Sequence, residues 1–254
     1  MTRLKKIKSI RSKLRLGKLT LGSWMQIPNS SVAEIMGFSG YDWISIDLEH
    51  GSISIDTLPD LFRAIELGGS LPLVRLAQAN AKDCKQALDA GAGGVIVPMI
   101  ESAEQLKFIK AKSSWPPVGT RGVAYTRANL FGGTFKDYMK EAQSPLIIAM
   151  IETKQGLENI EEILEVKGLD AIMIGPYDLS ASIGKTADFK SKKYLDAMRM
   201  ILDSAKSKNV PCGIHIVEPS KTELKKRVKE GFRFIAYSMD SVMLRNSAKL
   251  KISE

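Results

Sequence analysis

The feature that most constrains the fold of this chain is the spacing of its apolar segments. Short apolar segments recur about every 25 residues, with amphipathic stretches between them. The segments expected to be strands are 19–25, 42–48, 71–76, 93–98, 146–151, 169–174, 211–216 and 232–237. Helix-like runs between them include 56–67, 81–89, 102–112, 155–166, 191–208 and 219–230. Eight such units predict a parallel (β/α)8 TIM barrel.

An open doubly wound sheet is the competing architecture. It is disfavoured because no G-x-G-x-x-G turn follows the first expected strand. The length of 254 residues suits one barrel, which usually takes about 250. No linker divides the chain, so residues 1–254 are expected to form a single domain.

The basic charge is concentrated at the N-terminus. Residues 1–18 hold eight Lys or Arg and no acid, which leaves 29 of the 37 basic residues against 28 acidic ones elsewhere. Leu4, Ile7, Ile10 and Leu14 recur at helical spacing and predict an amphipathic helix that closes the barrel floor. Binding to RNA or to an anionic membrane surface is the alternative. No aromatic residue interleaves these bases, so a nucleic-acid partner is not expected.

Cysteine usage and hydropathy indicate the compartment. Cys84 and Cys212 lie far apart in the sequence, so neither a disulfide framework nor a thiolate metal site is expected, and a reducing cytoplasm fits best. The longest apolar stretch, 146–151, is far shorter than the roughly 20 residues that cross a bilayer. No membrane insertion or export is expected. The irregular segment 113–138 is expected to form an ordered loop over the barrel mouth.

The active site of a (β/α)8 barrel lies at the carboxyl ends of its strands, so the residues expected there are the candidates. Glu152 and Asp178 follow neighbouring strands and could chelate one cation. Two oxygen ligands that leave positions open suit Mg²⁺ or Mn²⁺, whereas zinc would prefer nitrogen or sulfur. The alternative is that either carboxylate only caps the helix that follows it.

His50 and Arg75 also stand at strand ends. His50 follows Asp47-Leu48-Glu49 and is a candidate general base. Arg75 could stabilise an oxyanion, or it could form a salt bridge to an acid of the second strand. Together with a cation these groups suit enolate chemistry: a metal that chelates a 2-oxo acid acidifies its methyl group, a base removes the proton, and an arginine stabilises the enolate.

The sequence resembles the HpcH/HpaI aldolase family of metal-dependent pyruvate aldolases, nearly from end to end. The motifs that carry the resemblance are G-S-W (22–24), Y-D-W-I-S-I-D-L-E-H-G (41–51), L-V-R (73–75), L-D-A-G-A (88–92), V-P-M-I-E-S-A-E-Q (97–105), P-P-V-G-T-R-G-V (116–123), I-E-T-K-Q-G-L-E-N (151–159) and I-G-P-Y-D-L-S-A-S-I-G (174–184).

The resemblance implies the role of each residue. His50 is the proton acceptor and Arg75 the stabiliser of the enolate-like transition state. Glu152 and Asp178 are the ligands of Mg²⁺, Mn²⁺ or a similar ion such as Co²⁺. The family's aspartate that increases the basicity of the histidine matches Asp89. The expected substrate-binding set is Trp24, Arg75, Met150, Tyr177, Asp178 and His215, with backbone amides at Tyr177 and Asp178 holding the pyruvate carboxylate.

Asp89 precedes the fourth expected strand, on the barrel floor, and could hardly reach His50 of its own barrel. It is therefore expected to enter the site of a neighbouring subunit, in agreement with the homohexamers that the family forms.

Three positions depart from the family pattern. Met150 replaces a glutamine, Tyr177 replaces a small alanine, and His215 replaces a leucine near the aldehyde-binding region. His215 could recognise a hydroxylated or anionic aldehyde, or it could simply hydrogen-bond the barrel rim.

The expected function is a class II aldolase that cleaves or forms a 4-hydroxy-2-oxo acid from pyruvate and an aldehyde. The alternatives are a citryl- or malyl-thioester lyase, which needs a coenzyme A site, and an enzyme that decarboxylates or condenses oxaloacetate. A non-enzymatic basic binding protein is the last alternative. The intact set of His50, Arg75, Glu152 and Asp178 argues against it.

Overall fold

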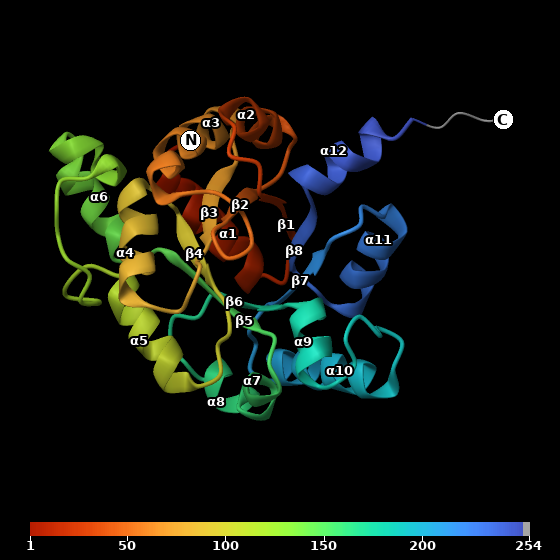
Figure 1. Cartoon of the computed structure of the whole chain (residues 1–254). Coiled ribbons are helices and arrows are strands. Elements are labelled where there is room, and N and C mark those ends of the chain that lie inside the picture. The colour runs from red at the N-terminus through yellow and green to blue at the C-terminus, as the bar shows by residue number, and fades with distance from the viewer. Residues whose placement is uncertain (251–254) are drawn as a thin grey trace.

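The computed structural model describes residues 1–250; residues 251–254 of the predicted domain lie outside the described residues. Eight parallel strands close into a barrel in chain order (Figure 1). They are β1 (Thr20–Met25), β2 (Trp43–Asp47), β3 (Leu71–Arg75), β4 (Gly94–Val97), β5 (Leu146–Ile151), β6 (Ala171–Ile174), β7 (Cys212–Ile216) and β8 (Phe234–Met239). The predicted (β/α)8 barrel is confirmed, and the open sheet is excluded.

Helices follow the strands in alternation. They are α1 (Arg3–Arg15), α2 (Ser30–Phe38), α3 (Leu58–Gly68), α4 (Ala81–Ala90), α5 (Ala103–Ser113), α6 (Phe135–Ala142), α7 (Lys154–Glu158), α8 (Ile160–Leu164), α9 (Pro176–Ser182), α10 (Lys192–Ser207), α11 (Lys221–Glu230) and α12 (Asp240–Ala248), with 3-10 turns at Ile55–Thr57 and Arg127–Gly132. Side-chain N-caps begin several of them, because Asn and Ser oxygens satisfy the free N–H groups of the first turn. These caps are Asn29, Asn80, Ser102, Ser191 and Ser220.

One predicted helix is wrong in detail. The run 155–166 is two short helices, α7 and α8, which meet at Asn159. The Asn159 backbone leaves the helical region (φ −97°, ψ 15°), and its Nδ2 donates a hydrogen bond to the carbonyl oxygen of Glu101 at 2.7 Å. A side-chain bond to a neighbouring loop thus replaces continuous helix.

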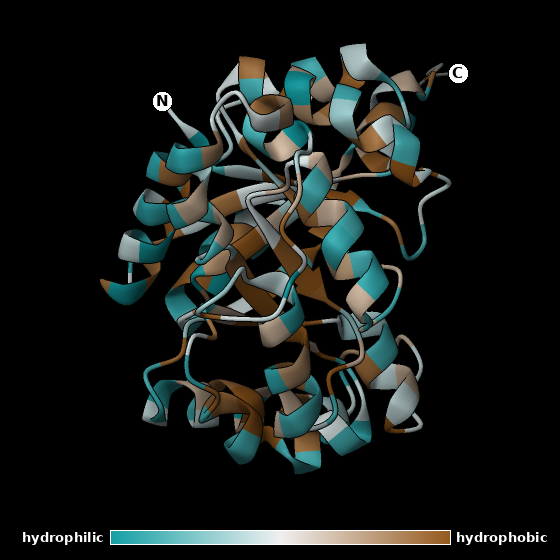
Figure 2. Ribbon diagram, turned by 90° about the vertical axis from the view of Figure 1, so that its left-hand side faces the viewer, coloured by the Kyte–Doolittle hydropathy of each residue, from teal (hydrophilic) through white to brown (hydrophobic). Residues whose placement is uncertain are grey.

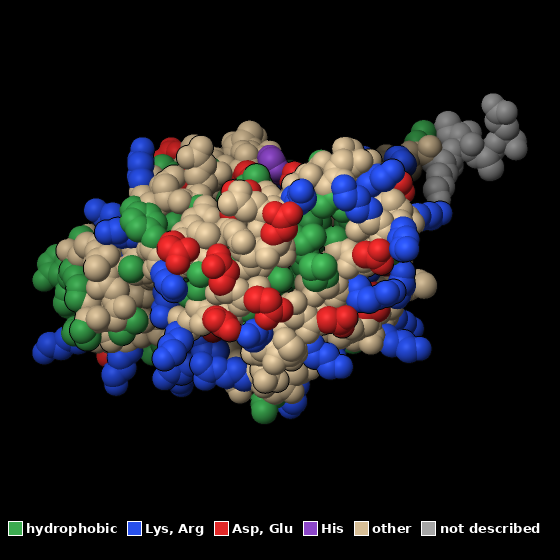
Figure 3. All heavy atoms as spheres, turned by 90° about the horizontal axis from the view of Figure 1, so that it is seen from below, with side chains coloured by type: hydrophobic (Ala, Val, Ile, Leu, Met, Phe, Trp, Pro, Cys, Tyr) green, Lys and Arg blue, Asp and Glu red, His purple; other side chains and the backbone are tan. Residues whose placement is uncertain are grey.

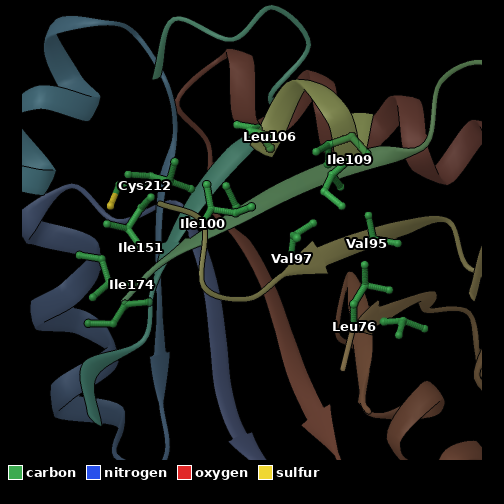
Figure 4. Packing of buried hydrophobic residues seen from close by; sticks show 14 of the residues in the cluster. Leu76, Val95, Val97, Ile100, Leu106, Ile109, Ile151, Ile174 and Cys212 are labelled. Carbon is green, nitrogen blue, oxygen red and sulfur yellow. The ribbon is translucent and has the colours of Figure 1, made fainter. Parts of the chain in front are cut away.

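Strand side chains alternate between the barrel interior and the helix layer. Outward residues pack with the helices, and Figure 4 shows Leu106 and Ile109 of α5 near Val95 and Val97 of β4. Figure 2 shows the apolar strands in the centre and hydrophilic residues on the helices around them. Inside the barrel a separate cluster is formed by residues such as Trp43, which stacks on Phe234 with ring centroids 4.3 Å apart.

The predicted N-terminal amphipathic helix is confirmed as α1, which falls within the ring of strands in Figure 1. Ile7, Ile10 and Leu14 are at most 3% exposed and belong to the interior cluster. Its basic side chains bind groups that lie just before strands, which places α1 at the amino ends of the barrel. Lys6 donates to the Ser70 carbonyl, Lys13 pairs with Asp42, and Arg11 pairs with Asp170 at 2.6 Å.

The segment 113–138 does not cover the barrel mouth, so that expectation is corrected. It joins the end of α5 to β5, and a connection from a helix to the next strand lies at the amino ends of a barrel. Arg127 pairs with Glu66 at the end of α3 (2.6 Å), and Arg3 of α1 donates to the Ala128 carbonyl at 2.6 Å. Part of the segment is also helical, because α6 begins at Phe135.

Across residues 1–250, no helix is both long enough and apolar enough to span a membrane.

Candidate active site

A pocket of about 290 Å³ opens at the carboxyl ends of the strands. It is lined by Trp24, Gln26, His50, Arg75, Met150, Gly175, Pro176, Tyr177, Asp178, His215, Val217 and Met239. Of the predicted site residues, seven therefore lie in one pocket. Glu152 borders Gly175 of this pocket, and Asp89 is not among the lining residues.

Arg75 is fixed by two carboxylates, Asp47 at the end of β2 and Glu49 in the turn that follows it. Asp47 and Arg75 are register partners on β2 and β3, and both point into the barrel. Arg75 Nε and Nη2 donate to the two oxygens of Asp47 at 2.9 and 2.6 Å, and Nη1 lies 3.0 Å from Glu49 Oε2. The predicted alternative of a salt bridge to a second-strand acid is thus observed, while Arg75 also lines the pocket.

The charges of this group follow from its burial. Burial alone would raise the pKa of Asp47, but its hydrogen bonds and ion pair with Arg75 lower it below the usual value. Burial raises the pKa of Glu49, and the charge of Arg75 opposes that shift. Asp47 is therefore a stable anion that holds the guanidinium in place.

His50 stands at the mouth. Its backbone N–H donates to Asp47 Oδ1 at 3.1 Å, which sets the turn after β2, and its side chain is exposed. Within residues 1–250 its imidazole makes no side-chain hydrogen bond, so it is free to meet a substrate proton.

Glu152 is a buried carboxylate with one oxygen left unpaired. Oε1 accepts a hydrogen bond from the Met99 N–H at 2.7 Å, whereas Oε2 is enclosed and has no partner among residues 1–250. Burial raises the pKa of Glu152 to about 7, and the charges of Glu49 and Asp178 add to the shift. A Cβ at Gly175 would lie 2.3 Å from Oε2, so only glycine leaves room for this carboxylate.

Neither predicted metal ligand caps a helix. Thr153 caps α7 through its own hydroxyl, and α9 begins at Gly175 without a side-chain cap. Asp178 is exposed in the first turn of α9 and lines the pocket. In the described part of the chain, no group of three or more His, Cys, Asp or Glu is placed to hold a metal.

Asp89 lies near the end of α4, on the outside of the barrel. It pairs with Arg121 at 3.4 Å, and burial raises its pKa while Arg121 and Lys85 oppose the rise. The structure does not bring Asp89 to the His50 of its own chain.

The far wall of the pocket is aromatic. Trp24 stacks on His215 with centroids 5.0 Å apart, and the Arg75 guanidinium lies 5.4 Å from the Trp24 ring. His215 Nε2 is 3.1 Å from the Ser238 carbonyl oxygen, which is the rim hydrogen bond considered from the sequence. Tyr177 is 49% exposed and meets Phe189 edge to face.

Three contributors have no individual role among the expectations from the sequence. Asp47 is anticipated only as one of the second-strand acids that could pair with Arg75, although alternation from Trp43 already points it inward. Gln26 stands two residues after Trp24, so the same alternation could have placed it in the pocket, where its Nε2 donates to Asp47 Oδ2 at 2.9 Å. The hydrogen bond from the Met99 N–H could not be predicted from the sequence, because the direction of this group depends on the positive φ of Met99, 52°.

The fold and the pocket define a (β/α)8 barrel in which a histidine, an arginine and an aspartate line one pocket and the buried Glu152 lies beside it. The chain belongs to the HpcH/HpaI aldolase/citrate lyase family, whose model matches residues 20–247. It is 34% identical to a 2-dehydro-3,6-dideoxy-6-sulfogluconate aldolase of Pseudomonas putida, over 90% of this chain and 89% of the relative. It is 36% identical to a 4-hydroxy-2-oxovalerate aldolase of Novosphingobium aromaticivorans, over 92% and 89% of the two chains.

A crystal structure from the same family, from Burkholderia cenocepacia J2315, superposes with a TM-score of 0.88 at 30% identity, covering 94% of this chain and 95% of the other. With these relatives, the protein is a carbon–carbon lyase of the class II aldolase type.

Proposed function

We propose that this protein cleaves 4-hydroxy-2-oxo acids to pyruvate and an aldehyde, and catalyses the reverse condensation, with the help of a divalent metal ion. The observation that carries the proposal is the enclosed, unpaired Oε2 of Glu152, whose environment also holds the charges of Glu49 and Asp178. Such an oxygen is costly to leave without a partner, and a bound cation would supply one. The name of the Novosphingobium relative, which specifies a 4-hydroxy-2-oxo acid, is in keeping with this substrate class.

Glu152 and Asp178 would hold the ion, with Mg²⁺ or Mn²⁺ the best match to two carboxylates and Co²⁺ an acceptable substitute. When bound, the ion supplies a Lewis acid that polarises the keto group of the 2-oxo acid. The N–H groups at Tyr177 and Asp178 are in the first turn of α9, where backbone donors have no partner within the helix. They would hold the carboxylate of the substrate.

The remaining residues move the proton and stabilise charge. In cleavage, His50 takes the proton of the C4 hydroxyl, the C3–C4 bond breaks, and the electron pair of that bond forms the enolate of pyruvate while the aldehyde leaves. Protonated His50 then gives its proton to C3, which yields pyruvate. Arg75, held rigid by Asp47 and Glu49, stabilises the enolate oxygen. In the reverse direction His50 removes a methyl proton of pyruvate. Trp24 and Met150, which are 1% and 3% exposed, exclude water from the enolate.

We also propose that the active form is a homohexamer in which Asp89 of one subunit completes the site of another. Exposed apolar side chains support a contact surface close to Asp89. These side chains belong to the segment whose Arg121 pairs with Asp89. Figure 3 shows hydrophobic side chains gathered at the end of the molecule that carries α6. The exposed residues are Val118, Val123, Tyr125, Leu130, Phe131 and Met139. A cytoplasmic location is part of the proposal, in keeping with the free, buried thiols of Cys84 and Cys212.

The proposal is tested by following pyruvate release from a series of 4-hydroxy-2-oxo acids. With Mg²⁺ or Mn²⁺ the protein is expected to release pyruvate, and a chelator or Glu152→Gln is expected to lower kcat/KM by about a hundredfold or more. Release that is unaffected by the chelator contradicts the metal assignment. No release from any member of the series, with activity on a coenzyme A thioester instead, contradicts the substrate class.

A further inference from the structure

We propose that His215 accepts, at Nδ1, a hydrogen bond from a hydroxyl group of the aldehyde substrate, so that the enzyme selects hydroxylated aldehydes over deoxy and anionic ones. The inference rests on the proposed function and names the substrate class of its aldehyde half.

The imidazole of His215 is held in one orientation. Its Nε2 lies 3.1 Å from the Ser238 carbonyl oxygen, which also accepts a hydrogen bond from Ser23 Oγ at 3.3 Å. Ser238 has a positive φ of 57°, a conformation that costs energy for a residue with a side chain and that fixes its carbonyl group. The Trp24 ring, stacked at 24° on the imidazole, closes one face.

This contact decides the tautomer. A carbonyl oxygen can only accept a hydrogen bond, so Nε2 of His215 carries a proton. Burial, together with the nearby charge of Arg75, lowers the pKa of His215 to about 4 although the Ser238 carbonyl opposes the shift. At neutral pH the ring is therefore uncharged, and Nδ1 has a free lone pair.

Nδ1 is left as an unused acceptor. It has no hydrogen-bond partner among residues 1–250, it is not one of the enclosed polar atoms, and His215 is one of the residues that line the pocket. A ligand that fills the pocket removes the water from this atom. A hydroxyl group replaces that hydrogen bond, whereas a methyl group leaves Nδ1 unpaired.

The surrounding wall does not favour an anion. The neighbouring lining residues Gln26, Val217 and Met239 are uncharged, and the one permanent cation among the lining residues, Arg75, is already engaged by Asp47 and Glu49. A carboxylate placed against Nδ1 would meet a lone pair instead of a donor. Of the two aldehyde classes that the sequence left open, the geometry thus favours the hydroxylated one.

The test compares aldehydes that differ in one group. Condensation with pyruvate is measured for glycolaldehyde, acetaldehyde and glyoxylate, as kcat/KM for each aldehyde in the presence of Mn²⁺. Wild type is expected to prefer glycolaldehyde over acetaldehyde by about tenfold, since sites that hydrogen-bond a hydroxyl reject analogues that lack it. His215→Leu is expected to reduce this ratio to about one, and His215→Gln to keep part of it because its Oε1 can accept.

Met200→Leu is the control, because Met200 is exposed on α10, outside the pocket, and the variant should keep the wild-type ratio. A ratio in wild type that equals the ratio in His215→Leu overturns the inference, and so does a preference for glyoxylate. If His215→Leu does not fold, the inference is still tested by the three wild-type kcat/KM values and by the ratio for His215→Gln. Absence of condensation with every aldehyde would instead overturn the proposed function, and the inference with it.

Discussion

At the scale of single residues, the candidate site depends on which charged groups have partners. Asp47 and Arg75 satisfy each other through two hydrogen bonds, so this pair is a fixed part of the pocket wall. Glu152 is the opposite case, because its Oε2 is enclosed without a partner. The same carboxylate has space only because residue 175 is glycine.

Gly175→Ala is therefore expected to weaken metal binding without touching a ligand. The added Cβ would fall 2.3 Å from Glu152 Oε2, so the carboxylate must move away from its position beside Gly175. The affinity for Mn²⁺, measured by titration calorimetry, should fall by about tenfold or more, as when residues that orient a metal ligand are changed. Gly122→Ala is the control, since its Cβ would meet nothing closer than 3.9 Å. Equal Mn²⁺ affinities in the two variants would argue against Glu152 as a ligand.

At the scale of the element, strand alternation accounts for most of what could be predicted. Residues two apart on a strand share a face, so Trp24, Arg75, Met150 and His215 could be placed in the mouth once the strands were drawn. The helix α1 could be predicted in a similar way, because apolar residues at three- and four-residue spacing share one face of a helix. The basic residues of α1 had suggested RNA binding as an alternative. Three of them contact groups that lie just before strands.

Two features of the elements were not accessible to this reasoning. The tautomer of His215 depends on the Ser238 carbonyl, and the two groups meet only because β7 pairs with β8. It also depends on the positive φ of Ser238, which the residue type does not indicate. The Met99 N–H reaches Glu152 through a similar irregular φ. The misplaced segment 113–138 was an error of a different kind, because the order of α5 and β5 already assigns it to the barrel floor.

At the scale of the whole molecule, one barrel does not contain every residue that the family resemblance assigns to the site. Asp89 lies on α4 beside Arg121, and His50 lies at the mouth. If Asp89 serves a neighbour, two inactive variants can repair each other in mixed oligomers.

His50→Gln and Asp89→Asn are each expected to lose most of their aldol activity as homo-oligomers. After joint dissociation and reassembly, some sites would combine an intact His50 from one subunit with an intact Asp89 from another, and activity should return. A mixture that remains as inactive as its two components would show that both residues must come from the same chain. An Asp89→Asn homo-oligomer that keeps its activity would show that Asp89 has no part in the site.

The central claim is that this pocket makes the enolate of pyruvate with a divalent ion, whatever the aldehyde. It is tested most directly by exchange of the methyl protons of pyruvate with deuterium, followed by proton NMR in D₂O without any aldehyde. The account predicts exchange by wild type with Mn²⁺ or Mg²⁺, and almost none after chelation or in His50→Gln. Absence of exchange by the metal-loaded wild type, or exchange that persists in the chelator, would contradict it.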